Sequence, residues 1–193
     1  MEEKRGTTKG EKTKRRILEI SLHLFADQGY HGTSMRDIAQ AANVSLGLAY
    51  NYFRNKEDLL EQIFIDHGTR INAWMMKRKE RANYMPGSIS SLVDDAIDMV
   101  VEHKDYFRLL WNLMLLKSGA VFEDLLNHSQ YQKIFERVKK TFLEKDPQCP
   151  DYKVEAFMQH FIGATVGYLS NPRIFSPEAA KSTIKDMYVD KTL

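Results

Sequence analysis

The sequence is short of cysteine, of export signals and of long apolar runs. Its 193 residues include a single cysteine, Cys149, which excludes an internal disulfide and a cysteine-based zinc site. The charged N-terminus lacks the apolar stretch of about 7 to 15 residues that a signal peptide needs. The most apolar window, 109–116, is far shorter than the roughly 20 residues that span a bilayer. These absences indicate a reducing, cytoplasmic setting and no membrane partner.

The sequence also lacks the motifs of common enzymes and of metal sites. It contains no Gly-rich phosphate loop and no nucleophile motif. No spacing of histidines, cysteine and carboxylates favours a metal. Asp94 and Asp95 are adjacent on an expected helix, where their side chains diverge, so they do not suit a catalytic pair. We therefore expect no enzyme, no cofactor and no metal.

The net charge is small and unevenly placed. The chain has 28 basic and 26 acidic residues, a formal charge of +2. Residues 1–16 carry seven basic and three acidic side chains, a local charge of +4, and the remainder sums to −2. Lys12, Lys14, Arg15 and Arg16 adjoin the first expected helix. Either they contact an anionic partner, or they are a solvated, flexible segment.

Apolar side chains recur at helical spacing through most of the chain. Proline is absent before residue 86, so short helices can run through the first part without interruption. The expected helices cover 12–28, 34–42, 45–52, about 56–81, 88–103, 105–117, 121–145, 151–170 and 177–189, and in one alternative the seventh is split near His128. No stretch alternates with the two-residue period of a half-buried strand. The sequence therefore predicts an all-α protein of about nine helices.

The first helices are short and have readable ends. Gly29 ends the first helix, and the candidate N-caps that follow are Thr33 or Ser34, then Ser45 and Asn55. Asp37 is placed as the acid of a capping box, and Asn43 tolerates the left-handed conformation of a tight turn. Two short helices joined by about three residues after a longer one describe a helix-turn-helix, although many small helical bundles share this spacing.

Residues 15–64 make the assignment more specific. They read RRILEISLHLFADQGYHGTSMRDIAQAANVSLGLAYNYFRNKEDLLEQIF. Its characteristic segments are FADQGYHGTS, MRDIAQAA, the VS pair, the single glycine of the third helix, the YxYF ending and KEDL. In these segments the run resembles the DNA-binding domain of the TetR family of bacterial transcriptional regulators. The resemblance covers about a quarter of the chain.

The resemblance implies a domain organisation and a function. A helix-turn-helix DNA-binding domain is expected over 1–58, and the helix from about 56 links it to a helical effector-binding and dimerisation domain over 59–193. The expected protein is a homodimeric repressor that binds a palindromic operator in double-stranded DNA and is released by an unknown small-molecule effector. The alternative is a ligand-independent DNA-binding adaptor or structural protein whose C-terminal domain contacts a protein partner.

The candidate DNA contacts lie on the second to fourth helices. They are Thr33, Ser34, Arg36, Ser45, Leu46, Gly47, Leu48, Tyr50, Asn51, Tyr52 and Lys56. Thr33 and Ser34 offer hydroxyl and N–H groups to a phosphate, and Gly47 allows the backbone to approach DNA. The resemblance implies phosphate contacts for Tyr50 and Lys56. Tyr52 either reaches a phosphate or is a half-buried core residue.

The third helix departs from the usual family pattern. Residues 46–49 read LGLA, where relatives commonly begin with a polar or basic residue, and the helix has no Arg or Lys to grip guanine. Leu46 and Leu48 suit thymine methyl groups, which predicts an A·T-leaning operator with Asn51 or Arg36 as polar readers. The alternative is that Leu48 packs inward and that specificity comes from the preceding helix and from DNA shape.

Two further sets of residues concern the C-terminal domain. The resemblance implies that the last two helices, over Val154–Leu169 and Ala179–Tyr188, form the dimer interface. Gly163 and Gly167 would permit a close approach of two helices there. The alternative is that these segments pack in the internal core. The candidate effector pocket consists of Phe107, Trp111, Met114, Phe157, Met158 and Phe161. These large, soft or aromatic side chains suit an adaptable apolar cavity and an ordinary core equally well.

Overall fold

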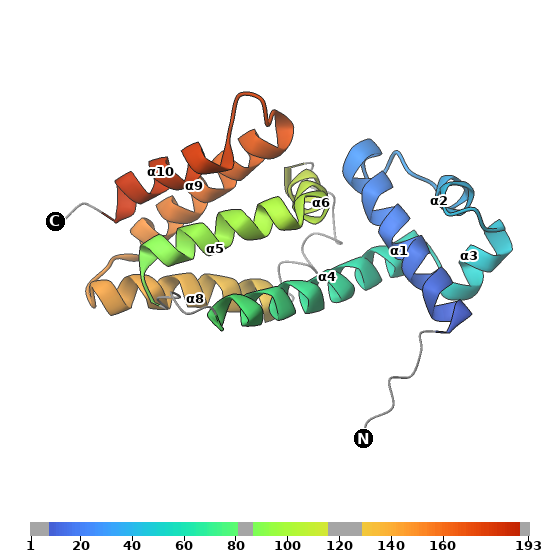
Figure 1. Cartoon of the computed structure of the whole chain (residues 1–193), viewed down its shortest axis with the longest axis horizontal. Helices are drawn as coiled ribbons and strands as arrows, with labels where there is room; N and C mark the ends of the chain where they lie inside the picture. The colour runs from blue at the N-terminus through green and yellow to red at the C-terminus, as the bar shows by residue number, and fades with distance from the viewer. Residues whose placement is uncertain (1–7, 81–86, 116–128, 190–193) are drawn as a thin grey trace, which may run out of the picture. The chain divides into compact units, whose positions relative to one another are not determined.

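The computed structural model describes residues 8–80, 87–115 and 129–189. Within these ranges the chain forms nine α-helices and no strand, which confirms the predicted all-α fold (Figure 1). The helices are α1 (Lys9–Gln28), α2 (Met35–Ala41), α3 (Leu46–Tyr52), α4 (Lys56–Lys79), α5 (Ile89–Glu102), α6 (Lys104–Leu115), α8 (Ser129–Lys145), α9 (Asp151–Ser170) and α10 (Pro177–Tyr188). The suggested split near His128 lies outside the described residues.

The first helix starts earlier than the apolar pattern predicts. Thr8 caps α1 through a capping box, in which Glu11 N–H donates to Thr8 Oγ1 at 3.2 Å and Thr8 N–H donates to Glu11 Oε2 at 2.6 Å. This turn is polar and therefore invisible to a search for apolar periodicity. Gly29 ends the helix with φ +81°, a conformation that favours glycine.

The predicted caps of the next helices are confirmed. Ser34 and Asp37 form the capping box of α2, and Ser45 Oγ accepts from Leu48 N–H at 3.1 Å at the start of α3. Asn55 Oδ1 accepts from Asp58 N–H at 2.7 Å at the start of α4. These bonds join residues three positions apart, which explains why the sequence predicts them well.

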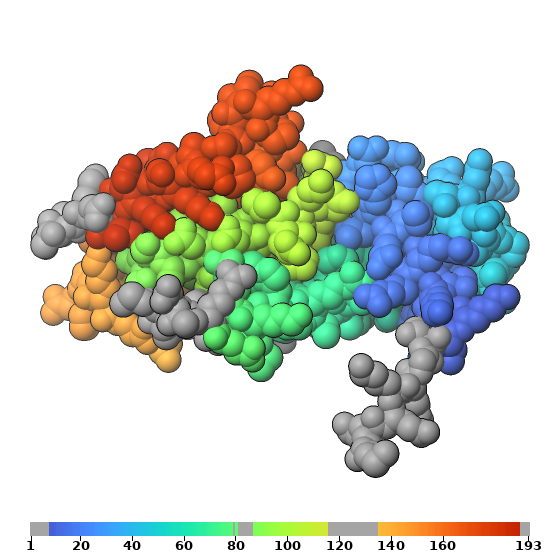
Figure 2. Space-filling view, in the orientation of Figure 1, coloured from blue at the N-terminus to red at the C-terminus, as the bar shows by residue number. Residues whose placement is uncertain are grey.

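The chain divides into two compact units, residues 1–69 and 70–193. In the first unit, α1, α2 and α3 pack around a core to which the first half of α4 contributes Leu59, Leu60 and Ile63. The other large buried side chains of this core include Ile17, Phe25, Ile38 and Phe53. The start of α4 therefore belongs to the helix-turn-helix unit. In Figure 2 the surface of this unit is coloured blue through teal.

In the second unit, α10 lies along α5 and α9, and α9 also packs against α6 and α8 (Figure 1). Ion pairs reinforce this packing: Arg78 of α4 bonds Asp95 and Asp98 of α5, and Asp98 is also bonded by Lys181 of α10. The Arg78 guanidinium lies 4.8 Å from the centre of the Trp74 ring. Among the described helices, none is long and apolar enough to cross a membrane.

Candidate nucleic-acid interface

The third helix presents one face to the core and another to solvent. Ala49 is completely buried, whereas Leu48 and Tyr50 are 36% and 48% exposed and Gly47 and Asn51 are also exposed. A side-chain carbon added at Gly47 would meet nothing within 4 Å. Leu48 is thus partly accessible to solvent and partly packed against the domain. The outward face of α3 is thus small and partly apolar around Gly47, with an amide at one end.

Leu46 and Arg36 differ in exposure. Leu46 is half-buried at the start of α3, so only part of its side chain is accessible. Arg36, in the first turn of α2, is exposed. Ser45 is also exposed, but its hydroxyl oxygen is engaged as the cap of α3.

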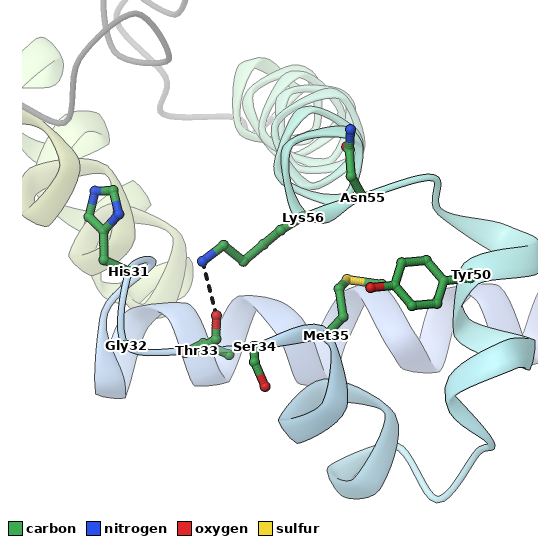
Figure 3. Close-up of a pocket in the computed structure, with 8 residues that line it drawn as sticks. All are labelled: His31, Gly32, Thr33, Ser34, Met35, Tyr50, Asn55 and Lys56. Atoms are coloured by element: carbon green, nitrogen blue, oxygen red, sulfur yellow. Dashed lines mark hydrogen bonds between the residues drawn. The ribbon is translucent and has the colours of Figure 1, made fainter.

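A shallow pocket of about 360 Å³ lies between the α1–α2 turn, the end of α3 and the start of α4 (Figure 3). Its lining residues are His31, Gly32, Thr33, Ser34, Met35, Tyr50, Asn55 and Lys56. We call it the Lys56 pocket. The expected phosphate contacts Tyr50 and Lys56 come to this pocket from different helices.

The ammonium of Lys56 is held by the α1–α2 turn. Its Nζ donates to the carbonyl oxygens of Tyr30 at 2.8 Å and Thr33 at 3.0 Å, the second of which Figure 3 marks. The same Nζ lies 4.3 Å from the centre of the Tyr30 ring. Two of the three ammonium donors therefore bond backbone carbonyls, and the positive charge lies at the wall of the pocket.

Tyr30 also binds the residue that follows Lys56. Its hydroxyl donates to Glu57 Oε1 at 2.9 Å, and its ring is buried against Phe25 with centroids 5.2 Å apart. Burial and the neighbouring Glu57 carboxylate raise the pKa of Tyr30 well above its ordinary value. The backbone N–H of Glu57 and the Tyr30 hydroxyl hold the pKa of the Glu57 carboxyl below its usual range.

The structure corrects the expectation for the Thr33 hydroxyl. Thr33 is 1% exposed, and its Oγ1 donates to Gly29 O at 2.9 Å, so the hydroxyl closes the turn and does not face the pocket. The Ser34 hydroxyl donates to Asp37 Oδ2 at 2.6 Å, and this bond is the main cause that lowers the pKa of the Asp37 carboxyl. Ser34 therefore serves first as the cap of α2.

Tyr52 is half-buried, in agreement with the core interpretation of this residue. A side-chain carbon built on Gly10 of α1 would lie 3.4 Å from the Tyr52 hydroxyl oxygen, which places this hydroxyl beside α1. Lys14 lies with its Nζ 5.7 Å from the centre of the Phe53 ring. Arg15 and Arg16 are exposed on the same helix. Lys14 therefore lies next to the residue that ends α3, and Arg15 and Arg16 are surface residues of the same helix.

The sequence predicts no role for the side chains of Tyr30 and Glu57. Tyr30 lies in the quoted FADQGYHGTS run and Glu57 in KEDL, but neither run indicates that the two side chains meet. Their bond joins positions 27 apart, so only the packing of α4 against the α1–α2 turn reveals it.

The six candidate effector residues lie on two helices that pack against each other, α6 and α9. On α6, Phe107 and Trp111 are buried with ring centroids 5.9 Å apart, and Met114 is half-buried. On α9, Phe161 is buried and Met158 half-buried.

Phe157 belongs to a different aromatic group. It contacts the rings of Phe142 of α8 and Tyr188 of α10, each with centroids 5.3 Å apart, which makes it a core residue of α8, α9 and α10. On α6, the buried Nε1 of Trp111 has no hydrogen-bond partner among the described residues. Those residues contain no group of three or more His, Cys, Asp or Glu side chains that would hold a metal.

The two glycines of α9 differ in their surroundings. Gly163 is exposed with open space around it, whereas a side-chain carbon at Gly167 would lie 3.2 Å from the Phe175 ring of the same chain. Gly167 thus accommodates the α9–α10 connection. On the surface of α9 and α10, Tyr152 and Met187 are 66% and 41% exposed.

Comparison with known proteins identifies relatives of this arrangement. Residues 17–63 match the family of bacterial regulatory proteins named tetR. The HTH-type transcriptional regulator AcrR of Shigella flexneri is 39% identical over 116 residues, which cover 58% of this chain and 53% of that protein. The HTH-type regulator YvkB of Bacillus subtilis is 23% identical over 133 residues, or 68% of this chain and 66% of the relative. The chain thus spans between half and two thirds of these relatives.

The fold extends beyond the matched N-terminal segment. A crystal structure of a transcriptional regulator from Aquifex aeolicus, described as of the TerR/AcrR family, has a TM-score of 0.69 and 23% identity. The similarity covers 91% of this chain and 96% of that one. Both units therefore have counterparts in the same fold.

Proposed function

We propose that the chain is a homodimeric transcriptional repressor of the tetR family and that it binds palindromic double-stranded DNA, because residues 17–63 match that family. The observation that carries this proposal is the solvent-facing side of α3, with Gly47, Leu48 and Asn51 exposed beside the Lys56 pocket. A helix-turn-helix places such a face in the major groove.

The phosphate contacts of the proposed complex come from the Lys56 pocket. Lys56 supplies a positive charge at the wall of the pocket, and the exposed Tyr50 supplies a phenol from the end of α3. Contacts of this kind position the domain on the duplex but do not read the sequence. Arg15 and Arg16 add two further cations that suit neighbouring phosphates.

The base contacts come from the outward face of α3. Leu48 packs on thymine methyl groups, Asn51 reads adenine through two hydrogen bonds, and Gly47 allows the helix to enter the groove closely. Arg36 of α2 is the second polar reader. Because α3 carries no cation for guanine, the operator has A·T-rich half-sites.

The C-terminal unit supplies the dimer contact and the effector site. The proposed dimer surface uses α9 and α10, where exposed Tyr152 and Met187 offer apolar area. The proposed effector lies against α6, where the buried Nε1 of Trp111 suits a hydrogen-bond acceptor on an otherwise apolar molecule. Binding there changes the spacing of the two DNA-binding units and releases the operator.

Selection from a random duplex library with the full chain tests the DNA-binding proposal. We expect an inverted repeat with A·T-rich half-sites one helical turn or more apart. Recovery of no enriched sequence, or of G·C-rich half-sites, contradicts the proposed recognition. A thermal-shift screen then seeks small molecules that stabilise the protein, and those that also release the selected duplex support the effector proposal.

One observation favours the alternative of an adaptor that contacts a protein. Ile174 and Phe175, in the connection between α9 and α10, are 71% and 50% exposed, which makes an apolar projection on the second unit. If no small molecule in the screen alters DNA binding, and Ile174→Ser leaves DNA binding intact but abolishes repression in cells, the adaptor function replaces the effector function.

A further inference from the structure

Tyr30 connects the two adjacent, oppositely charged residues that begin α4. The Lys56 ammonium lies over the face of its ring and bonds its carbonyl oxygen, while the Glu57 carboxylate bonds its hydroxyl at the edge of the ring. The Lys56 ammonium and the Glu57 carboxylate therefore contact different parts of Tyr30.

This separation matters for any anion in the Lys56 pocket. The pocket includes Lys56 and Tyr50 among its lining residues but not Glu57. A carboxylate released from the Tyr30 hydroxyl would either pair with the neighbouring ammonium or add a negative charge beside the pocket. Both outcomes oppose a bound phosphate, because like charges a few ångströms apart repel even near a protein surface.

We infer that Tyr30 is a positioning residue for DNA binding: its hydroxyl holds the exposed Glu57 carboxylate in place so that the Lys56 ammonium stays available to a backbone phosphate. The inference rests on the proposed function, since it assigns a DNA phosphate to the pocket. It gives a buried phenol a part in DNA affinity without any contact between that phenol and DNA.

The variant Tyr30→Phe isolates the hydroxyl. It keeps the ring, and with it the packing on Phe25 and the interaction with the Lys56 ammonium. The probe is a fluorescein-labelled 30-base-pair duplex of mixed sequence, because phosphate contacts do not depend on sequence. Fluorescence anisotropy measures affinity across a series of salt concentrations.

We expect Tyr30→Phe to weaken duplex binding about threefold to tenfold per bound domain. Lys56→Ala removes the phosphate contact itself and lowers the slope of log affinity against log salt by about 0.9 per domain. Tyr106→Phe removes the hydroxyl of a buried tyrosine of α6 in the second unit, outside the proposed DNA and dimer surfaces, and as the matched control it leaves affinity unchanged.

The same substitution in a Glu57→Gln background separates positioning from a structural role. A neutral amide cannot compete for the ammonium, so Tyr30→Phe is expected to cost less than about twofold in that background. An equal loss in both backgrounds shows that the phenol acts through the fold and overturns the inference.

The controls also separate this inference from the proposed function. A wild-type protein that binds the duplex and is weakened by Lys56→Ala, but not by Tyr30→Phe, overturns the inference alone. A wild-type protein without salt-dependent duplex binding overturns the proposed function, and the inference with it.

Discussion

Asp98 of α5 is the carboxylate on which the ion pairs of the second unit converge. Arg78 Nη1 lies 2.8 Å from its Oδ2, and Lys181 Nζ bonds its Oδ1. Asp98→Asn keeps the side-chain shape but removes the charge. Lys181 then loses its acid, and Arg78 retains only Asp95 at 2.6 Å. We expect this one substitution to destabilise the contacts between α4, α5 and α10.

The magnitude follows from the exposure of the partners. Removing one member of a buried ion pair costs about 3–5 kcal/mol, whereas exposed pairs contribute less than about 1 kcal/mol. The side chains of Arg78 and Asp98 are 14% and 31% exposed, so this network is intermediate. We expect Asp98→Asn to lower the free energy of unfolding by about 2 kcal/mol, which corresponds to roughly 4–8 °C in Tm for a chain of this length.

The pH dependence has a definite sign. Burial alone would raise the pKa of Asp98, but hydrogen bonds from Lys181 and Arg78 and their positive charges outweigh it, and the pKa lies below its usual value. A carboxyl with a lower pKa in the folded state stabilises the protein above the unfolded-state pKa of about 4. This contribution is lost as the pH falls through the folded-state pKa. Wild type should therefore lose more stability in acid than Asp98→Asn.

Urea denaturation followed by circular dichroism, at one protein concentration and at pH 7 and pH 3, measures both effects. The control is Glu19→Gln on α1, which removes an acid 3.3 Å from Arg15 in a pair with 63% and 52% exposed side chains. It should change stability by less than about 0.5 kcal/mol. The reasoning is refuted if Asp98→Asn at pH 7 is no more destabilising than this control.

Substitutions at three other places give expectations of different kinds. Gly47→Ala should raise the free energy of unfolding, measured by urea denaturation, by about 0.5–1 kcal/mol, because the added methyl group meets open space. The same substitution should weaken duplex binding, and unchanged binding would contradict a close approach of α3 to DNA. Ser34→Ala should cost about 1 kcal/mol because the α2 cap is removed, and Ser34→Thr much less, in the same denaturation assay. Alanine at Lys14, Arg15 and Arg16 should lower the salt slope of duplex binding by about 0.9 for each phosphate that is no longer neutralised, and an unchanged slope would make them solvated charge.

The sequence predicts features that depend on neighbouring residues. The caps at Ser34, Ser45 and Asn55 follow from bonds across three positions, and the positive φ of Asn43, 51°, follows from its side chain. The predicted start of α1 is too late, because its first turn is polar and only the Thr8 capping box marks it.

The site depends on contacts between distant residues, which the sequence does not predict. The sequence places Lys56 towards phosphates, but its bonds to Tyr30 and Thr33, 26 and 23 positions away, arise from the packing of α4 against the α1–α2 turn. The same limit applies to Gly167, for which the sequence predicts a close approach of two helices. In the structure the ring of Phe175 occupies that space.

The central claim is that the outward face of α3 reads DNA. The most direct test compares the double variant Leu48→Ala/Asn51→Ala with wild type on the selected operator and on a scrambled duplex of equal length. Removal of base contacts worth about 1–3 kcal/mol each predicts at least a tenfold decrease in operator affinity, with scrambled-duplex affinity and Tm nearly unchanged. Operator affinity equal to that of wild type would contradict the claim.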